Sequence, residues 1–518
     1  MSGIASDLVE FNSRRFPGAP ALENAETGSV TSWLQLEDKV ARLAGGLAQR
    51  FGIAKGDRVV LLADNDTRLF ELQFACMRLG AIFVPLNWRL AAPELIFQCE
   101  DAEPRLIVHD ATWAESARTM ATETGVEQIL TWGMDDTEAD FDRLIDQSSP
   151  MRPSRENLLS DPTHILYTSG TTGRPKGAFS TFGTIAWQTL NIVHVNFLGG
   201  PGCKLFDPLP LFHAGGLTTL AAPMLATGGC VTVARRFDPE QVLSFIGRPA
   251  SGVTHYGGVP TMYQMMVDSP AFSTSDFSGL RHTQIAGSSP SEELVATLVD
   301  RGILPQEQYG GTETGPNIAS VPRESVIGKS GSCGFPVPYT QIRLVGPDGT
   351  DVEQGEVGEV WLSGPSVSPG YWRMEADSDG HHVDGWLLTG DAARQDEDGF
   401  LYISGRYKDM YKSGGENVFA AEVEWVLIDH PDVLEAAVIG IPDPRWSEVG
   451  RAYLVTRDGR EVTTEDVATF CDGRLARYKI PKSTVLVESL PRNATGKVIK
   501  DDLRAAVQAE VYHPATDD

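Results

Sequence analysis

The sequence predicts an α/β protein with a large N-terminal domain, made of layered α/β subdomains plus a β subdomain, and a small α+β C-terminal domain. Up to about residue 300, helical patterns alternate with continuous apolar runs, which are typical of a largely parallel sheet. From residue 328 the pattern changes to short strands separated by Gly, Pro and Asp turns. The length of 518 residues and the hydrophobic share of 41% suffice for more than one folded domain.

Capping residues set the predicted element boundaries in the N-terminal domain. Residues 36–51 have apolar side chains close to a helical period, and Gly52 ends that helix. Asp66 can cap a helix that runs to Leu79, and Gly80 is its C-cap glycine. Further helices are expected at 93–100, 181–195, 217–226, 260–267 and 291–300. Strands are expected at 58–63, 80–86, 105–109, 165–167, 230–234, 253–256 and 281–286, and 205–217 is a strand that breaks into a glycine turn.

The rest of the chain divides into a β subdomain and a compact C-terminal unit. Strands of the β subdomain are expected at 337–345, 358–363, 386–391 and 401–404. The C-terminal unit has expected helices at 420–430 and 464–475, and strands at 433–441, 451–456 and 483–487. We place the boundary between Tyr407 and Lys408, which gives domains 1–407 and 408–518.

Composition excludes several classes of function. The formal net charge of −27 repels nucleic acids and anionic membranes. The six cysteines are scattered singly, so neither a disulfide framework nor a zinc site is expected. No apolar run is long enough to span a bilayer, and the N-terminus lacks the apolar core of a signal peptide. A cytoplasmic enzyme without an integral membrane segment and without a nucleic-acid partner is therefore expected.

A loop at residues 167–177, with the sequence YTSGTTGRPKG, is the strongest motif. It follows a short buried strand, and such a loop suits a polyphosphate, because glycines let backbone N–H groups approach closely and hydroxyls donate further bonds. A P-loop nucleotide hydrolase needs glycine directly before its lysine, but Pro175 precedes Lys176 here. The alternative is a flexible surface loop. The phosphate-binding residues expected here are Thr168, Ser169, Gly170, Thr171, Thr172, Gly173 and Lys176.

The loop resembles the signature loop of the adenylate-forming family, which includes acyl-CoA synthetases, peptide-synthetase adenylation domains and luciferases. Two further segments, QYGGTET at 308–314 and PRNATGK at 491–497, extend the resemblance over almost the whole chain. In the first, Tyr309 offers a flat face for a purine, Thr312 a hydroxyl for the α-phosphate, and Glu313 a hard oxygen ligand for Mg²⁺. The resemblance also covers Gln308 and Gly310 in the nucleotide site.

The resemblance implies further nucleotide contacts. Gly287, Ser288 and Ser289 stand where the family contacts adenine through its backbone, although the family usually has G-G-A-P there. Asp391, in a T-G-D motif, resembles the ribose ligand, because a carboxylate accepts bonds from both ribose hydroxyls. Arg406 resembles the family's ribose and phosphate partner. A turn residue or a surface ion pair is the alternative interpretation of Asp391 and Arg406.

Lys497 resembles the family's catalytic lysine, and the implied reaction has two steps. A carboxylate attacks the α-phosphate of ATP and releases pyrophosphate, while the Lys497 ammonium stabilises the charge that develops. A thiol then attacks the acyl-adenylate and releases AMP. In the family the small C-terminal domain rotates between the steps. The resemblance therefore implies a hinge at Lys408 and a second face at Lys412, Gly414 and Gly415, where adjacent glycines admit a pantetheine arm.

Substrate contacts are also implied by the resemblance. Trp446 and Tyr478 resemble positions that face the coenzyme A nucleotide, although both residue types are more often simple packing residues. His213 resembles the gate of the acyl pocket and completes the expected catalytic set with Thr168, Glu313 and Lys497; a buried structural histidine is the alternative. The expected pocket walls are Trp187, Tyr256, Gly257, Gly258 and Gly311. A medium-chain or branched fatty acid and an aryl or arylpropenoic acid both remain open.

Four functions are weighed. The first is an ATP-dependent acyl-CoA synthetase that uses ATP, Mg²⁺ and coenzyme A. The second is a stand-alone adenylating enzyme that loads a carrier protein, and the third is a luciferase-like oxidase. The fourth is a non-catalytic binding protein, which the presence of both Glu313 and Lys497 disfavours. Further partner expectations are a homodimer and a protein acetyltransferase that acts on Lys497, which lies in a P-x-x-x-x-G-K context.

Overall fold

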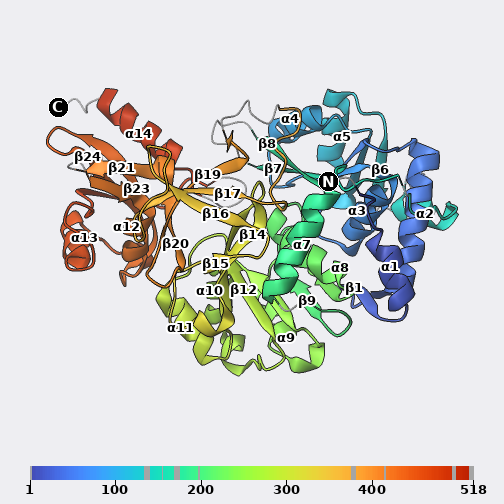
Figure 1. Cartoon of the computed structure of the whole chain (residues 1–518), viewed down its shortest axis with the longest axis horizontal. Helices are drawn as coiled ribbons and strands as arrows, with labels where there is room; N and C mark the ends of the chain where they lie inside the picture. Colours follow the sequence, from blue (N-terminus) through green and yellow to red (C-terminus); the bar gives the residue numbers. More distant parts are fainter. Residues whose placement is uncertain are drawn as a thin grey trace. The chain divides into compact units, whose positions relative to one another are not determined.

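The computed structural model describes residues 3–133, 140–154, 156–168, 175–196, 199–374, 381–413, 416–492 and 498–512 (Figure 1). Its contacts divide the chain into two compact units. Unit 1 comprises Met1–Gln341 and Leu362–Leu387, and unit 2 comprises Ile342–Trp361 and Leu388–Asp518. Among the described residues, no helix combines the length and the apolar character that a membrane crossing requires.

A six-stranded sheet in unit 1 carries the phosphate loop. Its strand order is β6-β5-β3-β4-β7-β8, and every pair is parallel except β7 and β8. The strands are β3 (Arg58–Leu62), β4 (Ile82–Pro85), β5 (Leu106–Asp110), β6 (Ile129–Trp132), β7 (Pro162–Thr168) and β8 (Lys176–Thr181). The described ends of the loop, Thr168 and Lys176, therefore lie on the paired strands β7 and β8 at one edge of the sheet.

A nine-stranded sheet of unit 1 has the order β15-β14-β13-β12-β11-β9-β10-β1-β2. The run from β13 to β1 is parallel, and β14, β15 and β2 are antiparallel additions at its two edges. The strands are β1 (Pro20–Asn24), β2 (Val30–Ser32), β9 (Lys204–Asp207), β10 (Cys230–Val233), β11 (His255–Gly258), β12 (His282–Ala286), β13 (Pro305–Gly311), β14 (Gly315–Ser320) and β15 (Phe335–Pro336).

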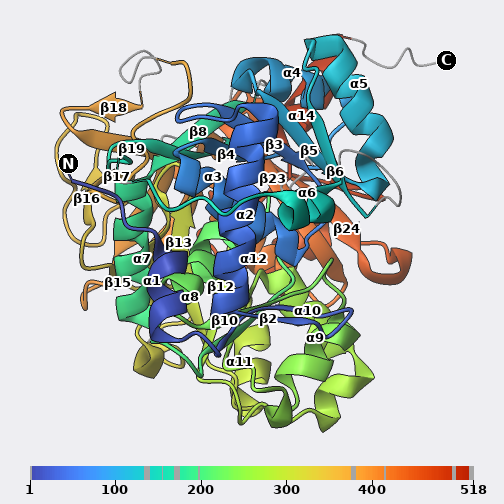
Figure 2. The same ribbon diagram turned by 90° about the vertical axis from the view of Figure 1, so that its right-hand side faces the viewer.

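Helices cover both sheets of unit 1. The main core contains apolar residues of α2 together with Val59 and Leu61 of one sheet and Val231 and Val233 of the other, so α2 fills the space between the two sheets (Figure 2). The helices are α1 (Leu8–Arg15), α2 (Trp33–Phe51), α3 (Thr67–Leu79), α4 (Ala92–Ala102), α5 (Ala114–Thr124), α6 (Phe141–Gln147), α7 (Phe182–Asn196), the π-helical η2 (Gly215–Ala221), α8 (Ala222–Ala226), α9 (Pro239–Ile246), α10 (Pro260–Asp268) and α11 (Glu292–Asp300). Short 3₁₀ turns are η1 (Ala111–Trp113), η3 (Pro249–Ser251), η4 (Pro270–Thr274) and η5 (Arg323–Ser325).

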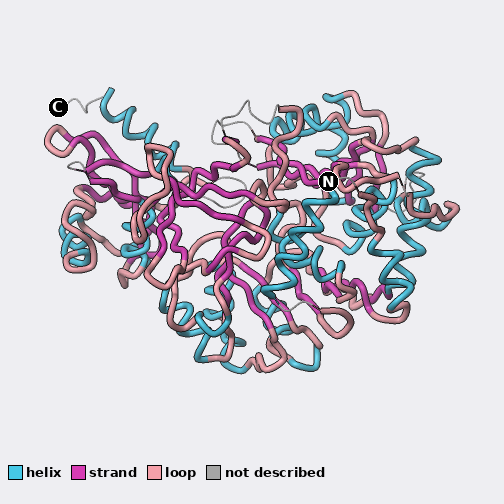
Figure 3. Tube along the Cα trace, in the orientation of Figure 1, coloured by secondary structure: helices cyan, strands magenta, loops and turns pink. Residues whose placement is uncertain are grey.

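Unit 2 is rich in strands, which Figure 3 draws in magenta. One sheet has the order β16-β17-β19-β18, with β20 paired to β19. Its strand β18 belongs to unit 1, and the chain passes between the units within β16, β17 and β19. A second sheet has the order β22-β21-β24-β23, with β25 paired to β24. The elements are β16 (Gln341–Val345), β17 (Gly358–Ser363), β18 (His382–Val383), β19 (Trp386–Gln395), β20 (Leu401–Arg406), η6 (Tyr407–Asp409), β21 (Met410–Ser413), β22 (Glu416–Phe419), α12 (Ala420–Ile428), β23 (Val433–Asp443), β24 (Ser447–Thr456), η7 (Arg457–Gly459), α13 (Thr464–Cys471), β25 (Ser483–Leu486) and α14 (Lys500–Tyr512).

The expected fold class is confirmed, and the capping residues correctly predicted where α3 begins and ends. Helix α3 begins after Asp66, whose carboxylate accepts a bond from the Arg68 N–H, and it ends at Gly80 in the left-handed conformation. The boundary at residues 407 and 408 stays a prediction, because the contacts divide the chain elsewhere, within the β subdomain. The strand expected at 253–256 lies two residues later, and the strand expected at 337–345 begins only at Gln341.

Strand β8 was not expected from the sequence, and it directly precedes α7, the helix expected at 181–195. Glycine is unfavourable in strands, so the segment around Gly177 gave a weak strand signal. In the structure, a Cβ on Gly177 would lie 2.7 Å from Cγ2 of Ile165. The absence of a side chain therefore lets β8 pack closely against β7, a tertiary reason that the local pattern does not show.

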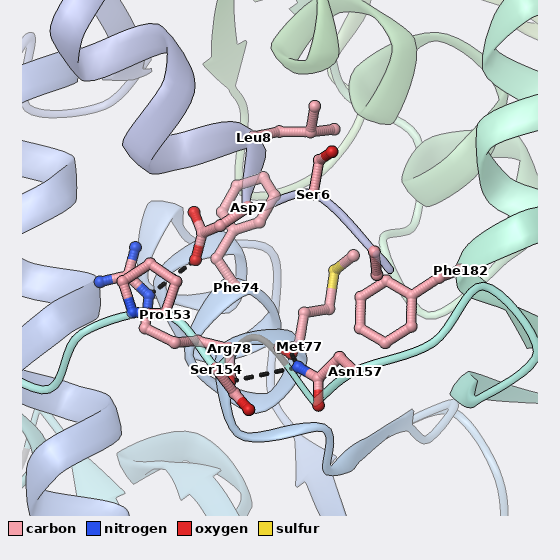
Figure 4. A pocket seen from close by; sticks show the side chains of 11 residues that line it. Ser6, Asp7, Leu8, Phe74, Met77, Arg78, Pro153, Ser154, Asn157 and Phe182 are labelled. Atoms are coloured by element: carbon pink, nitrogen blue, oxygen red, sulfur yellow. Dashed lines mark hydrogen bonds and ion pairs between the residues drawn. The ribbon is translucent and has the colours of Figure 1, made fainter. Parts of the chain in front are cut away.

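A buried arginine fixes the N-terminal segment to α3. The Arg78 guanidinium bonds Asp7 at 2.8 Å and Glu37 at 2.6 Å, and the Arg78 side chain is completely buried. The Asn157 amide donates to the Met77 carbonyl at 2.9 Å. Figure 4 shows Arg78 next to Asp7, and Asn157 next to the end of α3, in a small pocket that Leu8 and Phe74 also line. Three segments distant in the sequence are thus joined at the end of α3.

We predict that Arg78→Met strongly destabilises the protein. Removing one partner of a buried ion pair leaves uncompensated carboxylates and costs about 3–5 kcal/mol. The exposed Arg14, which pairs with Glu10 one helical turn away, provides the control, because such pairs contribute at most about 0.5 kcal/mol. Urea unfolding of both variants measures the difference. Equal unfolding free energies for Arg78→Met and Arg14→Met would contradict the assigned role.

Candidate active site

The mouth of the phosphate loop is held by paired strand ends. Thr168 ends β7, Lys176 begins β8, and the two are opposite each other in the antiparallel register. The preceding Tyr167 hydroxyl donates to the Asp101 carboxylate at 2.7 Å and to the Gln98 carbonyl at 3.0 Å, which fixes the strand end to α4. The expected phosphate ligands Ser169, Gly170, Thr171, Thr172 and Gly173 lie outside the described residues.

The carboxylate of Glu313 meets this loop mouth from the turn between β13 and β14. Its Oε1 accepts a bond from the Thr168 hydroxyl at 2.8 Å and one from the Tyr371 hydroxyl at 3.1 Å. The Lys176 ammonium lies 4.7 Å from the centroid of the Tyr371 ring. The structure thus brings together the predicted Thr168, Lys176 and Glu313. It adds Tyr371, which the sequence analysis missed.

Glu313 suits a magnesium ion that is carried by a polyphosphate. A carboxylate oxygen is the ligand type that Mg²⁺ prefers, and Mg²⁺ usually binds one or two carboxylates plus substrate phosphates and water. Within the described residues, no group of three or more His, Cys, Asp or Glu side chains could hold a metal ion. The remaining ligands of a metal at Glu313 would therefore come from phosphate oxygens and water.

The expected adenine-binding segments follow neighbouring parallel strands. Ala286 at the end of β12 pairs with Gln308 on β13, so the segment that begins at Gly287 lies beside Tyr309. Gly287 has a φ of +91°, which favours glycine. Ser288 and Ser289 follow it, and Thr312 is in the turn after β13. Carboxyl ends of adjacent parallel strands are where α/β proteins bind ligands.

Gly310 permits a tight turn next to Glu313. A Cβ at this position would lie 2.5 Å from the Gly315 carbonyl oxygen on β14. Any larger residue would therefore separate β13 from β14 and move the turn that carries Glu313. A Cβ on Gly311, in contrast, would have its nearest neighbour at 3.4 Å, the Thr314 hydroxyl. Gly310 is required by packing, whereas Gly311 leaves space.

In unit 2, the predicted ribose residues Asp391 and Arg406 face each other across β19 and β20. Arg406 Nε lies 2.8 Å from Asp391 Oδ1, and another guanidinium nitrogen donates to the Thr389 carbonyl at 2.9 Å. The Thr389 hydroxyl accepts a bond from the Asp391 N–H at 3.1 Å. The arginine therefore holds the carboxylate in a fixed position. Its role toward ribose stays a prediction.

The expected acyl-pocket residues lie on several elements of unit 1. His213 precedes η2, and its Nδ1 accepts a bond from the Gly215 N–H at 3.1 Å. Trp187 on α7 packs edge-to-face with Tyr339, with ring centroids 4.9 Å apart. Gly257 on β11 faces η2, because a Cβ there would lie 2.8 Å from Leu220.

Tyr256 and Gly258 face the opposite side of β11. The Tyr256 side chain is completely buried, and its ring packs edge-to-face against Tyr263 of α10 at 5.4 Å. A Cβ on Gly258 would lie 3.3 Å from the Tyr256 hydroxyl. Successive strand residues point to opposite faces of a sheet. The grouping of Tyr256, Gly257 and Gly258 as one pocket wall therefore stays a prediction. Of the three residues, this geometry favours Gly257 as a wall residue.

The expected coenzyme A residues lie in unit 2. Trp446 and Tyr478 are 42% and 36% exposed. The Arg445 guanidinium lies 4.9 Å from the Trp446 ring and the Lys479 ammonium 5.8 Å from the Tyr478 ring. Such exposed rings next to cations suit a nucleotide. Lys408 is in η6, and Lys412 is on β21, with its N–H bonded to Glu448 at 2.8 Å; Gly414, Gly415 and Lys497 lie outside the described residues.

The fold and the site together define an enzyme that activates carboxylates on ATP. The family model for AMP-binding enzymes matches residues 9–372, and that for the AMP-binding enzyme C-terminal domain matches residues 422–497. The feruloyl-CoA synthase of an Amycolatopsis species is 38% identical over 492 residues, which are 95% of this chain and 96% of that protein. The indoleacetate–CoA ligase of Aromatoleum aromaticum is 35% identical over 519 residues, 99% of both chains.

A solved structure agrees with these sequence comparisons. ATP-bound MatB from Rhodopseudomonas palustris superposes with a TM-score of 0.88 at 29% identity, and the match covers 98% of this chain and 100% of that chain. This chain therefore belongs to the AMP-binding enzyme family. It is an AMP-forming acid–thiol ligase that uses ATP, Mg²⁺ and coenzyme A.

A buried acid at the end of β9 lies six residues before His213. Asp207 Oδ1 accepts a bond from the Leu209 N–H at 3.1 Å, and Oδ2 has no hydrogen-bond partner within the described residues. Burial raises the pKa of Asp207 from its usual value to about 8. Asp207 is therefore protonated at neutral pH in the folded protein but ionised in the unfolded chain.

This difference predicts a pH-dependent stability. Because the folded pKa is raised, the contribution of Asp207 is fully present below the unfolded value and is lost as pH rises toward 8. The stability of Asp207→Asn relative to the parent protein should therefore increase from pH 5 to pH 8, by at most about 1.4 kcal/mol per pH unit. Urea unfolding at both pH values measures it, with the exposed Asp300→Asn as control. A constant difference would show that Asp207 is ionised in the folded protein.

Proposed function

We propose that this protein joins an aryl or arylalkyl carboxylic acid to coenzyme A through an acyl-adenylate. The observation that carries the first step is the contact of Thr168 with Glu313 at the mouth of the phosphate loop. The acid class is supported by the printed activities of the feruloyl-CoA synthase and the indoleacetate–CoA ligase, whose acids both carry an aromatic ring.

In the first half-reaction, a carboxylate oxygen of the acid forms a bond to the α-phosphorus of ATP, and the bond to pyrophosphate breaks. Lys176 and the loop hydroxyls hold the phosphates, and Lys497 supplies positive charge where the negative charge increases. Bound Mg²⁺ would neutralise phosphate charge as a Lewis acid next to Glu313. Asp391 and Arg406 would hold the ribose.

In the second half-reaction, the thiol of coenzyme A loses its proton and its sulfur bonds to the acyl carbon, while AMP leaves. We assign the nucleotide of coenzyme A to the exposed rings of Trp446 and Tyr478. The backbone at Gly414 and Gly415, beside Lys412, would line the path of the pantetheine arm. Rotation about Lys408 would exchange this face for Lys497 between the half-reactions.

The acyl group would lie between α7, η2 and the ends of β11 and β13. The side chains expected there are Trp187 and His213, Gly257 packs against Leu220 of η2, and Gly311 leaves space that a flat ring can use. The Trp187–Tyr339 pair provides an aromatic wall, since ring pairs favour edge-to-face contact. We infer that these positions select the acid.

The proposal also includes the regulation of the enzyme and its location in the cell. Acetylation of Lys497 by a protein acetyltransferase would remove its charge and stop the first half-reaction. A cytoplasmic location is supported by the six cysteines, all described, none of which forms a disulfide. The homodimer expected from the sequence stays a prediction.

A panel of carboxylic acids tests the proposed substrate class. With coenzyme A present, aryl and arylalkyl acids should give the fastest release of pyrophosphate and of AMP. A medium-chain or branched fatty acid that outperforms every aryl acid would contradict the acid class. AMP release that ignores coenzyme A but follows the addition of a carrier protein would contradict the thiol acceptor.

Gly311→Leu should narrow the acyl pocket. The extra side chain occupies space that a bulky acid needs, and overpacking of about 1–3 kcal/mol corresponds to a loss of about 10- to 100-fold with aryl acids. A short acid such as acetate should lose less. Gly18→Leu is the matched control, because nothing lies within 4 Å of a Cβ there. Equal losses with aryl acids and acetate would place Gly311 outside the pocket.

A further inference from the structure

Tyr371 contacts both charged groups at the mouth of the phosphate loop. Its hydroxyl donates to Oε1 of Glu313 at 3.1 Å, and its ring centroid lies 4.7 Å from the Lys176 ammonium. The side chain is half-buried, like those of Lys176 and Glu313. One tyrosine therefore bridges the predicted magnesium ligand and the predicted phosphate ligand through two different interactions.

The backbone of Tyr371 is fixed independently of its side chain. Tyr371 forms an antiparallel bridge with Ala178 of β8, and the Trp372 N–H donates to the Gly177 carbonyl at 2.7 Å. The Ser368 N–H donates to the Glu313 carbonyl at 2.9 Å. Backbone bonds thus connect this segment to β8 and to the turn of Glu313. A change of the Tyr371 side chain should leave the segment in place.

The hydroxyl restricts the orientation of the Glu313 carboxylate. Thr168 and Tyr371 both donate to Oε1, and neither of these bonds involves Oε2. Two donors on one oxygen define the plane of the carboxylate, whereas a single donor would let the carboxylate rotate about that one hydrogen bond. Hydrogen bonds to an ionised acceptor are also stronger than neutral ones. The arrangement gives the second oxygen of Glu313 a constant direction.

The ring acts on Lys176. An ammonium over an aromatic face is attracted by the ring quadrupole, and this attraction is modest at partly exposed sites. It keeps the lysine near the loop mouth when no polyphosphate competes for it. Lys176 also begins β8, so its backbone is already placed opposite Thr168. The ring therefore selects among the positions of a long, flexible side chain.

We propose that Tyr371 is a positioning residue for the metal–nucleotide complex, which orients Glu313 through its hydroxyl and Lys176 through its ring. The inference rests on the adenylation step proposed above and adds a residue to it. It predicts that the two functions separate: loss of the hydroxyl affects the magnesium dependence, and loss of the ring also affects the binding of ATP itself.

The test compares Tyr371→Phe, which keeps the ring, with Tyr371→Leu, which removes ring and hydroxyl. Tyr402→Phe is the matched control, because the Tyr402 hydroxyl contacts the Asp396 carboxylate at 3.3 Å and Arg394 lies 4.5 Å from its ring. Two readouts are used: the shift of the unfolding temperature by ATP, with Mg²⁺ or with a chelator, and the Mg²⁺ titration of acid-dependent pyrophosphate exchange.

For Tyr371→Phe, the Mg²⁺ concentration that gives half-maximal effect should rise about tenfold in both readouts, as expected for one hydrogen bond to a charged group. With the chelator present, the shift of its unfolding temperature by ATP should equal that of the parent protein. Its KM for the acid should also equal the parent value. For Tyr371→Leu, the shift of the unfolding temperature by ATP should be smaller than in the parent protein even when the chelator is present. Tyr402→Phe should match the parent protein throughout.

Three outcomes would overturn the proposal. The first is that Tyr371→Phe has the same Mg²⁺ titration as the parent protein. The second is that the Mg²⁺ titration of Tyr402→Phe changes as much as that of Tyr371→Phe. The third is a loss of the ATP shift in Tyr371→Phe both with and without Mg²⁺, which indicates a general distortion of the site. The temperature shift requires no acid, so it decides the role of Tyr371 even when the proposed acid class fails in the exchange assay.

Discussion

The carboxylate oxygen Oε1 of Glu313 is the point on which the site depends. It accepts hydroxyl bonds from Thr168, 145 positions earlier, and from Tyr371, 58 positions later. These three residues belong to the β7 end, the β13–β14 turn and the segment that lies beside β8. This acceptor therefore joins the end of β7 in one sheet to the β13–β14 turn of the other, beside the backbone bonds of the Tyr371 segment.

The chemistry explains why such a connection is useful. Adenylation needs little covalent participation by the protein, because the acid and ATP supply the bonds that form and break. The protein must position the groups and provide charge where it develops, and preorganised groups do so without reorganisation during the step. Glu313 and Lys176 are opposite in charge and are both held by Tyr371.

The reaction class and much of the fold were predictable from sequence because they depend on local signals. Helix α3 begins after Asp66 and ends at Gly80 as predicted, because capping involves residues a few positions apart. The loop at 167–177 and the segment at 308–314 identify the family because their composition is unusual. Such signals predict which residues contact a nucleotide, but not how distant segments meet.

What could not be predicted depends on tertiary contact. Strand β8 requires the close approach of Gly177 to Ile165, which no local pattern encodes. Tyr371 gave no signal, because a tyrosine in a loop acquires its role only from partners far along the chain. Arg78 looked like an ordinary helix residue until its contacts with Asp7 and Glu37 placed it in the interior. Tyr256 and Gly257 are neighbours in sequence, yet they face opposite sides of β11.

The central claim is that the cradle of Thr168, Lys176 and Glu313 and the charge of Lys497 act on the same phosphorus atom. The most direct measurement compares both half-reactions of Lys497→Ala in a single turnover. The account predicts that acyl-adenylate formation falls at least about 100-fold, while thioester formation from supplied acyl-adenylate and coenzyme A continues at the parent rate. Unchanged adenylate formation, or an equal loss in both half-reactions, would contradict it.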